Sequence, residues 1–131
     1  GRAAMRRAVG YANEREVFGR PIGQNQGVSF PLGEAQMRLD AAELMIRKAS
    51  WLLDHGEPCG AEANMAKWLA ADAAFQAADQ AVQTHGGFGY AREFHVERYW
   101  REARLMRIAP ISQEMILNYV TEHVLKLPRS Y

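Results

Sequence analysis

The sequence is short of cysteine, of long apolar runs and of net charge. It contains one cysteine, Cys59, so no intramolecular disulfide can form and a zinc site built on a cysteine cluster is excluded. No apolar run approaches the roughly 20 residues that a membrane-spanning helix needs. A formal net charge of +1 argues against nucleic-acid binding through bulk charge. We therefore expect no nucleic-acid partner and no membrane span.

The remaining composition is ordinary for a globular domain. Apolar residues make up 48% of the 131 residues and charged residues 24%, which predicts one domain over residues 1–131 with a real core. The single cysteine fits a reducing compartment, and we expect a cytoplasmic location. The N-terminal residues lack the apolar stretch of a signal peptide and enter a helical pattern at once. We expect Gly1 to be a cut end, such as a domain boundary.

Helical periodicity dominates, and no segment alternates with period two for long enough to predict a strand. One set of small and apolar residues is spaced alternately four and three apart: Val28, Leu32, Ala35, Leu39, Ala42, Ile46, Ala49 and Leu53. This spacing predicts a helix over about 25–55, with Pro31 in its first turn. A second long helix is predicted over 61–84, and its small residues would let a neighbouring helix approach closely: Ala66, Ala70, Ala73, Ala77 and Ala81.

Three further helices complete the prediction, over 2–17, 93–106 and about 110–127. Pro110 suits the first position of the last helix. The expected inward-facing residues are Ala4, Ala8, Tyr11 and Phe18 in the first, Val96, Tyr99, Trp100, Ala103 and Met106 in the second, and Ile116, Val120, Val124 and Leu127 in the third. The fold class is therefore all-α: an antiparallel up-and-down four-helix bundle with five helices in all.

Two short motifs suggest an anion or cofactor site, although each has an ordinary explanation. The block from Gln83 to Tyr90 carries two adjacent glycines, Gly86 and Gly87, at the end of the alanine-rich helix. Glycine admits a ligand close to the backbone, but it is also a common helix cap. Arg15 could bind a phosphate through its guanidinium, but it could equally be an exposed cation at a helix end.

Other polar groups favour structural roles. Arginines recur every three residues at Arg98, Arg101, Arg104 and Arg107, with acidic residues between them. We expect a solvated face with local ion pairs, such as Glu97 with Arg101, rather than an anion-binding stripe. No glutamate has a histidine three residues on, so the di-iron site typical of helical bundles is excluded and we expect no metal. Cys59 has no base nearby in the sequence, and we expect it to be structural.

Several blocks, in the right order, carry a family resemblance over nearly the whole chain. They are Tyr11 to Ile22 followed by Gln26, then Gln83 to Tyr90, Val96 to Arg104, and Ile108 to Met115. Together they resemble the C-terminal domain of the flavin-dependent acyl-CoA dehydrogenases. In that family the whole enzyme also has an N-terminal helical domain and a middle β domain. The resemblance therefore implies a fragment with its first helix shortened.

The resemblance also implies cofactor, partners and residue roles. FAD would lie partly between subunits of a homotetramer, with acyl-CoA as substrate and an electron-transfer flavoprotein or similar protein as acceptor. Arg15 would face the pyrophosphate, with Phe18 and Gln26 close to the nucleotide. The remaining cofactor-binding candidates are Gln83, His85, Gly86 and Gly87, which would meet a neighbouring subunit's cofactor, and Ser112 and Glu114, which would lie along the flavin nucleotide.

One departure from the family concerns the catalytic base. Many members have a glutamate where this chain has Pro110, and proline offers neither a carboxylate nor an N–H. Some branches of the family place the base near the start of the first helix, which would lie upstream of Gly1. We therefore expect a dehydrogenase whose base is outside this chain. The alternative is a non-catalytic helical assembly module of the same fold, and an upstream glutamate would distinguish the two.

Overall fold

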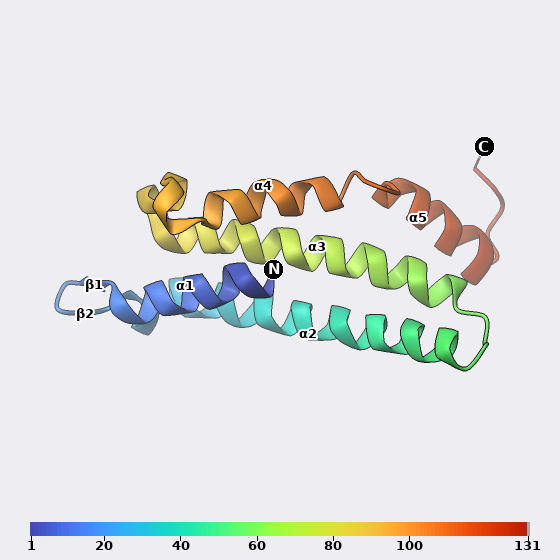
Figure 1. The fold of residues 1–131 in the computed structure, drawn as a ribbon, viewed down its shortest axis with the longest axis horizontal. Helices are drawn as coiled ribbons and strands as arrows, with labels where there is room; N and C mark the ends of the chain where they lie inside the picture. The colour runs from blue at the N-terminus through green and yellow to red at the C-terminus, as the bar shows by residue number, and fades with distance from the viewer. Residues whose placement is uncertain (131) are drawn as a thin grey trace.

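A computed structural model describes residues 1–130 and confirms the all-α prediction (Figure 1). The five α-helices of these residues are α1 (Arg2–Glu14), α2 (Gln26–Asp54), α3 (Gly60–His85), α4 (Val96–Met106) and α5 (Gln113–Tyr119). The two long helices thus lie within a residue or two of their predicted bounds. Within residues 1–130, no helix is both long and apolar enough to cross a membrane.

The long helices α2 and α3 form an antiparallel pair along the whole molecule, with α1 on one side and α4 and α5 following α3 (Figure 1). Small side chains form most of the core where α1, α2, α3 and α4 meet. Ala8, Ala77 and Ala81 are each 0% exposed. Alanine at these positions lets helix backbones approach closely, because there is little side chain to separate them. The predicted alanine stripe of α3 therefore faces the core.

The α2 seam, which is the face formed by the residues spaced four and three apart, is buried along only half of its length. Leu32, Ala35, Leu39 and Ala42 are buried, whereas Ile46 is 43% exposed and Leu53 is 67% exposed. The change coincides with the start of α1, because a Cβ added to Gly1 would lie 2.7 Å from Leu39 and 2.9 Å from the backbone of Ala74. Figure 1 places the N-terminus midway along the bundle. The second half of this face is exposed because α1 does not extend over it.

The first helix is shorter than predicted. It ends at Glu14, and a small antiparallel hairpin follows, with β1 (Glu16–Val17) paired to β2 (Arg20–Pro21). Phe18 and Gly19 form its two-residue turn with φ of 55° and 76°. Positive φ at both positions is the geometry of a type I′ turn. The prediction that Phe18 faces inward is wrong, because its side chain is fully exposed at this tip.

The predicted fourth helix starts later than expected. A 3₁₀ turn, η3 (Arg92–Phe94), comes first, and His95 at φ 63° redirects the chain into α4. Val96 and Ala103 are buried as expected, but Trp100 and Met106 are 39% and 45% exposed. Their predicted inward orientation is therefore wrong.

The last helix begins at Gln113, not at Pro110. Ser112 is its N-cap, and its Oγ accepts a hydrogen bond from the Met115 N–H at 3.3 Å. The helix continues as a π-helical turn, η4 (Val120–Val124), and the expected core residues Val124 and Leu127 are exposed. Pro31 lies in the second turn of α2, since that helix begins at Gln26.

Candidate functional site

A cleft of about 490 Å³ lies where the end of α1 meets the end of α3. Tyr11, Arg15, Val17 and Ile22 line one side. Gln83, Thr84, His85, Gly86, Gly87 and Phe88 line the other. Five of the predicted cofactor-binding residues thus meet in one place, although the two motifs are separated by almost 70 residues of sequence.

Two glycines bring the glycine block to this cleft: Gly86 turns the chain at the end of α3, and Gly89 lets the turn pack back on that helix. Gly86 adopts φ 58° directly after α3, a conformation that other residues rarely take, and so turns the chain out of the helix. A Cβ on Gly89 would lie 2.5 Å from the Val82 carbonyl oxygen, so only glycine lets the turn pack back on α3. Gly86 and Gly87, in contrast, have nothing within 4 Å of an added Cβ. Their open side leaves room for a ligand.

His85 lines the cleft but is itself buried. Its Nδ1 donates to the Ala81 carbonyl at 2.7 Å, since a carbonyl can only accept. Its ring stacks on Tyr11, with centroids 4.3 Å apart, and meets Phe94 edge-on at 5.6 Å. Together Tyr11 and Phe94 hold α1 and the η3 turn against the end of α3. The sequence motifs did not identify these two aromatic residues as supports for the site.

Arg15 joins α1 to the hairpin. Its N–H donates to the Tyr11 carbonyl, and its own carbonyl accepts from the Ile22 N–H, both at 2.8 Å. Within residues 1–130 no carboxylate lies in ion-pair contact with its guanidinium. Its charge is therefore free to face an anion in the cleft.

Four predicted residues lie outside this cleft. Phe18 occupies the hairpin tip, where positive φ in a bulky side chain costs free energy, and such strain often occurs at functional positions. Gln26 is exposed at the start of α2. Ser112 and Glu114 line a separate hollow of about 230 Å³ beside Arg104 and Arg107. Figure 1 shows that this region lies far along the bundle from the cleft.

Pro110 lies in the loop between α4 and α5, and Lys67 of α3 fixes that loop. The Lys67 Nζ donates to the carbonyls of Met106 and Ile111, each at 2.7 Å. Sequence reasoning missed Lys67, because a lone lysine on a helix carries no motif. It holds the segment that bears Ser112 and Pro110 against α3.

The arginine series of α4 divides between paired and unpaired groups. The predicted ion pair between Glu97 and Arg101 is present at 3.2 Å. Arg107 pairs with Asp72 at 3.5 Å, and its Nε donates to Gln113 at 2.8 Å. Arg98 has no carboxylate partner within residues 1–130 and instead lies 5.4 Å from the Tyr99 ring centroid. Local ion pairs thus involve Arg101 and Arg107, whereas Arg98 pairs with no carboxylate of residues 1–130.

The chain resembles known proteins in both sequence and structure. Residues 1–125 match the sequence profile described as acyl-CoA dehydrogenase, C-terminal domain. The chain is 50% identical over 133 residues to acyl-CoA dehydrogenase FadE12 of Mycobacterium tuberculosis, covering 100% of this chain and 34% of that protein. Butyryl-CoA dehydrogenase from Megasphaera elsdenii matches with a TM-score of 0.91 and 35% identity, over 96% of this chain and 33% of that one.

A further match is PigA solved as an FAD complex, with a TM-score of 0.89 and 28% identity over 92% of this chain and 32% of that one. The chain therefore spans about a third of the length of the proteins that it matches.

Proposed function

Because this chain belongs to the acyl-CoA dehydrogenase family, as its C-terminal domain, we propose that it is the FAD-binding and oligomerisation domain of a complete acyl-CoA dehydrogenase. The complete enzyme would form the α,β double bond of an acyl-CoA thioester. The observation that carries this proposal is the cleft in which Arg15 meets the glycine block.

The residues of the cleft fit the diphosphate of FAD. Arg15 offers a guanidinium that pairs with no carboxylate of residues 1–130, and a guanidinium can hold two phosphate oxygens at once. Gly86 and Gly87 leave their outer side open, so a ligand can reach the backbone. FAD, when bound, would supply a hydride acceptor for the β hydrogen of the substrate. The role of this chain is then to bind and orient the cofactor.

Sharing of the flavin between subunits is supported by the separation of the predicted residues. Ser112 and Glu114 share no lining residue with the cleft, and Phe18 projects from the hairpin into solvent. Two copies of the chain could bring these groups to one cofactor, as the family resemblance implies. We therefore place the cofactor site at a subunit interface in a homotetramer, with an electron-transfer flavoprotein or similar protein as acceptor and the cytoplasm as location.

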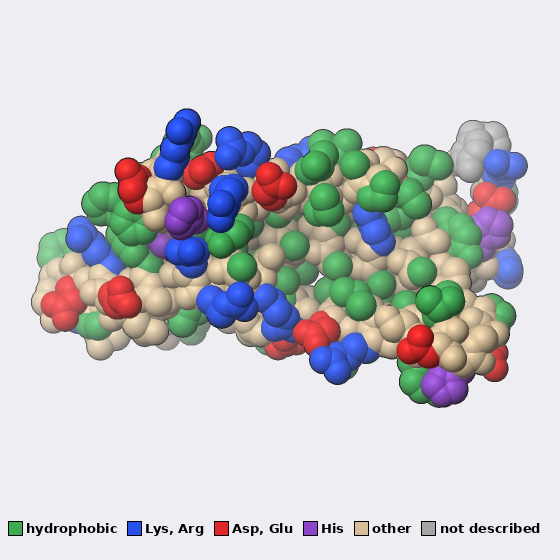
Figure 2. Space-filling model, in the orientation of Figure 1, with side chains coloured by type: hydrophobic (Ala, Val, Ile, Leu, Met, Phe, Trp, Pro, Cys, Tyr) green, Lys and Arg blue, Asp and Glu red, His purple; other side chains and the backbone are tan. Residues whose placement is uncertain are grey.

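Exposed apolar side chains in the second half of the bundle support this assembly. Figure 2 shows hydrophobic side chains along that half. Large apolar residues of α2 and α5 are 57–69% exposed: Leu44, Trp51, Leu53 and Met115. Exposed apolar surface that is larger than a few scattered side chains is typical of an interface. In the complete protein it would be covered by the rest of the chain or by another subunit.

This chain offers no catalytic base at the expected place. Pro110 cannot accept a proton. Glu114 lies four residues further on, in the first turn of α5, where it is exposed and lines the hollow beside Arg104. General-base catalysis requires a carboxylate within hydrogen-bond reach of the α proton. We therefore place the base on the helix that precedes Gly1. A non-catalytic assembly module of the same fold is the alternative, and it predicts no glutamate there.

The test uses the complete protein. Replacing the upstream glutamate by glutamine should abolish acyl-CoA turnover while FAD remains bound, and the isolated 131-residue chain should show no turnover even with added FAD and acceptor. Turnover by the isolated chain above a flavin-only control would show that the base is misplaced. A complete protein that binds FAD, has no upstream glutamate and does not turn over acyl-CoA would establish the assembly module instead.

A further inference from the structure

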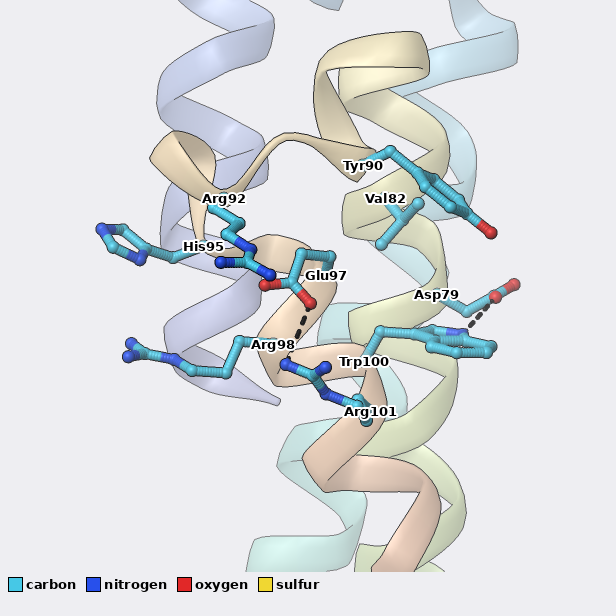
Figure 3. Close-up of a pocket in the computed structure, with 9 residues that line it drawn as sticks. All are labelled: Asp79, Val82, Tyr90, Arg92, His95, Glu97, Arg98, Trp100 and Arg101. Atoms are coloured by element: carbon cyan, nitrogen blue, oxygen red, sulfur yellow. Dashed lines mark hydrogen bonds and ion pairs between the residues drawn. The ribbon is translucent and has the colours of Figure 1, made fainter.

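A second hollow, of about 790 Å³, lies where the end of α3 faces the start of α4, and it shares no lining residue with the cofactor cleft (Figure 3). It is lined by Asp79, Val82, Tyr90, Arg92, His95, Glu97, Arg98, Trp100 and Arg101. These residues come from the end of α3, the 3₁₀ turns η2 (Gly86–Tyr90) and η3, and the start of α4 with the residue before it. Its size falls in the range of small-molecule sites, roughly 300–1,000 Å³. None of the expected FAD-binding residues lines it.

The carboxylates of this hollow already have partners, whereas two of its guanidinium groups pair with no carboxylate of residues 1–130. Asp79 accepts a hydrogen bond from the Trp100 Nε1 at 2.8 Å, and Glu97 pairs with Arg101 at 3.2 Å. Neither Arg92 nor Arg98 has a carboxylate within 4 Å in the described part of the chain. Two charged donors are therefore available to a ligand.

A third guanidinium adds positive charge beside the hollow. Arg7 of α1 and Arg98 of α4 lie near the same Tyr99 ring, 5.8 Å and 5.4 Å from its centroid. The Arg7 Nε donates to the Tyr99 hydroxyl at 3.4 Å. Hydrogen bonds from Arg7 and then Arg98 lower the pKa of the Tyr99 phenol below its ordinary value. Neither Arg7 nor Arg98 pairs with a carboxylate of residues 1–130, and two like charges held together in this way favour an anion at this edge.

The other edge of the hollow is aromatic. In Figure 3 the His95 and Arg98 side chains extend at one edge, the Tyr90 and Trp100 rings lie at the opposite edge, and Arg92 points between them. Tyr90 is 86% exposed and Trp100 is 39% exposed, so both rings can be reached from solvent. Exposed aromatic rings are stacking surfaces for nucleobases, and guanidinium groups bind phosphate in a fork.

We propose that this hollow binds an adenine nucleotide, with its phosphates at Arg92 and Arg98 and its base against Trp100 or Tyr90. The guanidinium edge fits the phosphates of such a ligand and the aromatic edge fits its base. Inorganic phosphate would use only the first edge, and adenosine only the second. The site is separate from the proposed FAD cleft and does not depend on it.

The test titrates ADP into the complete protein already saturated with FAD, by calorimetry and by Trp100 fluorescence. One ADP should bind per chain. Each lost charge-assisted contact in Arg92→Gln and Arg98→Gln should weaken ADP binding about tenfold, and Trp100→Leu should weaken it about fivefold or more. Arg47→Gln, which removes an exposed arginine paired with Glu43 on α2, is the matched control and should leave ADP affinity unchanged. FAD content should be the same in all four variants.

Separate titrations define the ligand. Phosphate alone and adenosine alone should each bind at least tenfold more weakly than ADP. Competition by coenzyme A would identify the nucleotide portion of a larger cofactor as the source, and its absence would identify a free nucleotide. Failure to bind ADP at millimolar concentration, equal ADP affinity in the double Arg92→Gln/Arg98→Gln variant, or binding of a polyglutamate peptide in place of ADP would overturn the proposal.

Discussion

The two halves of the α2–α3 pair carry the same kind of sequence and have different surroundings. Beside α1, Leu39 is 8% exposed and packs among alanines, whereas Leu53 in the other half is 67% exposed. Both residues belong to one unbroken series spaced four and three apart. The difference shows that periodicity fixes which face of a helix is apolar but not which element covers it.

The halves also differ in charge. In the half that holds α1, the hairpin and α4, Arg7, Arg15 and Arg98 have no carboxylate partner among residues 1–130. Figure 2 shows several Lys and Arg side chains on this half. The far half instead presents apolar side chains. One half is thus suited to anionic ligands and the other to protein contacts, which agrees with one domain that both binds a cofactor and assembles.

The largest expected effect tests the packing difference directly. In the 131-residue chain, Leu39→Ala should lower the free energy of unfolding by about 3 kcal/mol, because it removes a buried side chain and leaves a cavity. Leu53→Ala should change it by less than about 1 kcal/mol, because that side chain is largely in solvent. Urea unfolding of both variants measures the difference. In the complete protein the two costs should converge, and a Leu53 variant that stays neutral there would mean that the far half is never covered.

Two glycines of the near half separate folding from binding. Gly89→Ala should destabilise the fold by roughly 1–3 kcal/mol, because its Cβ would press on the Val82 carbonyl. A Cβ added to Gly87 has nothing within 4 Å, so Gly87→Ala should leave the thermal midpoint unchanged. The same substitution should reduce FAD retention in the complete protein, because the methyl group would occupy space that the cofactor needs. Thermal melts and flavin content after dialysis give both readouts. Full flavin content in the Gly87 variant would show that the cofactor does not approach this backbone.

Substituting an arginine in the cleft should affect FAD binding, whereas substituting an arginine on the exposed surface of α2 should not. In the complete protein Arg15→Ala should weaken FAD binding roughly 10- to 100-fold, because a charge-assisted contact is lost. Gln83→Ala should do so more mildly. Arg38→Ala, which breaks an exposed pair with Glu34 at 2.7 Å, should not change FAD affinity. An Arg15 variant that keeps stoichiometric flavin through dialysis would remove this residue from the site.

The smallest effect lies at the boundary between the halves, where Arg2 contacts Asp40 and Glu43. Hydrogen bonds from Arg47 and then Arg2 lower the pKa of Glu43 below 4.5, and bonds from Gln36 and then Arg2 lower that of Asp40 below 3.8. Carboxyl pKa values depressed by folding stabilise the fold above the unfolded pKa, and this stabilisation is lost as pH falls below about 4.5. Arg2→Gln should therefore flatten the acid side of a stability–pH curve slightly, and an unchanged curve would contradict this.

Sequence reasoning succeeded where a local rule determines the structure. The long helices followed from their spacing, and the pair Glu97–Arg101 followed from i,i+4 geometry. It failed where tertiary contacts decide. Phe18 continues a helical pattern in sequence, but the Phe-Gly turn and the Arg15 backbone bonds end the helix first. Trp100 belongs to the helical spacing that predicts an inward face, but its indole N–H donates to Asp79 at the rim of a hollow.

The sequence indicated which residues are candidates for the site but not which of them lie together in the fold. Arg15, Gln83 and Gly86 converge because α1 runs beside the end of α3. Ser112 lies elsewhere because Lys67 holds its loop against the first half of α3, whereas the cleft is at the end of that helix. No local pattern encodes either placement.

A complementation experiment tests the central claim, that two copies of this domain complete one flavin site. Complete protein carrying Arg15→Ala and complete protein carrying Ser112→Ala with Glu114→Gln should each retain little FAD. Unfolded together and reassembled, they should regain flavin in roughly a quarter of the sites, because random mixing in a symmetric oligomer restores that share of intact interfaces. Each variant reassembled alone is the control. Recovery near a quarter supports the shared site, and mixed samples with no more flavin than the controls would contradict it.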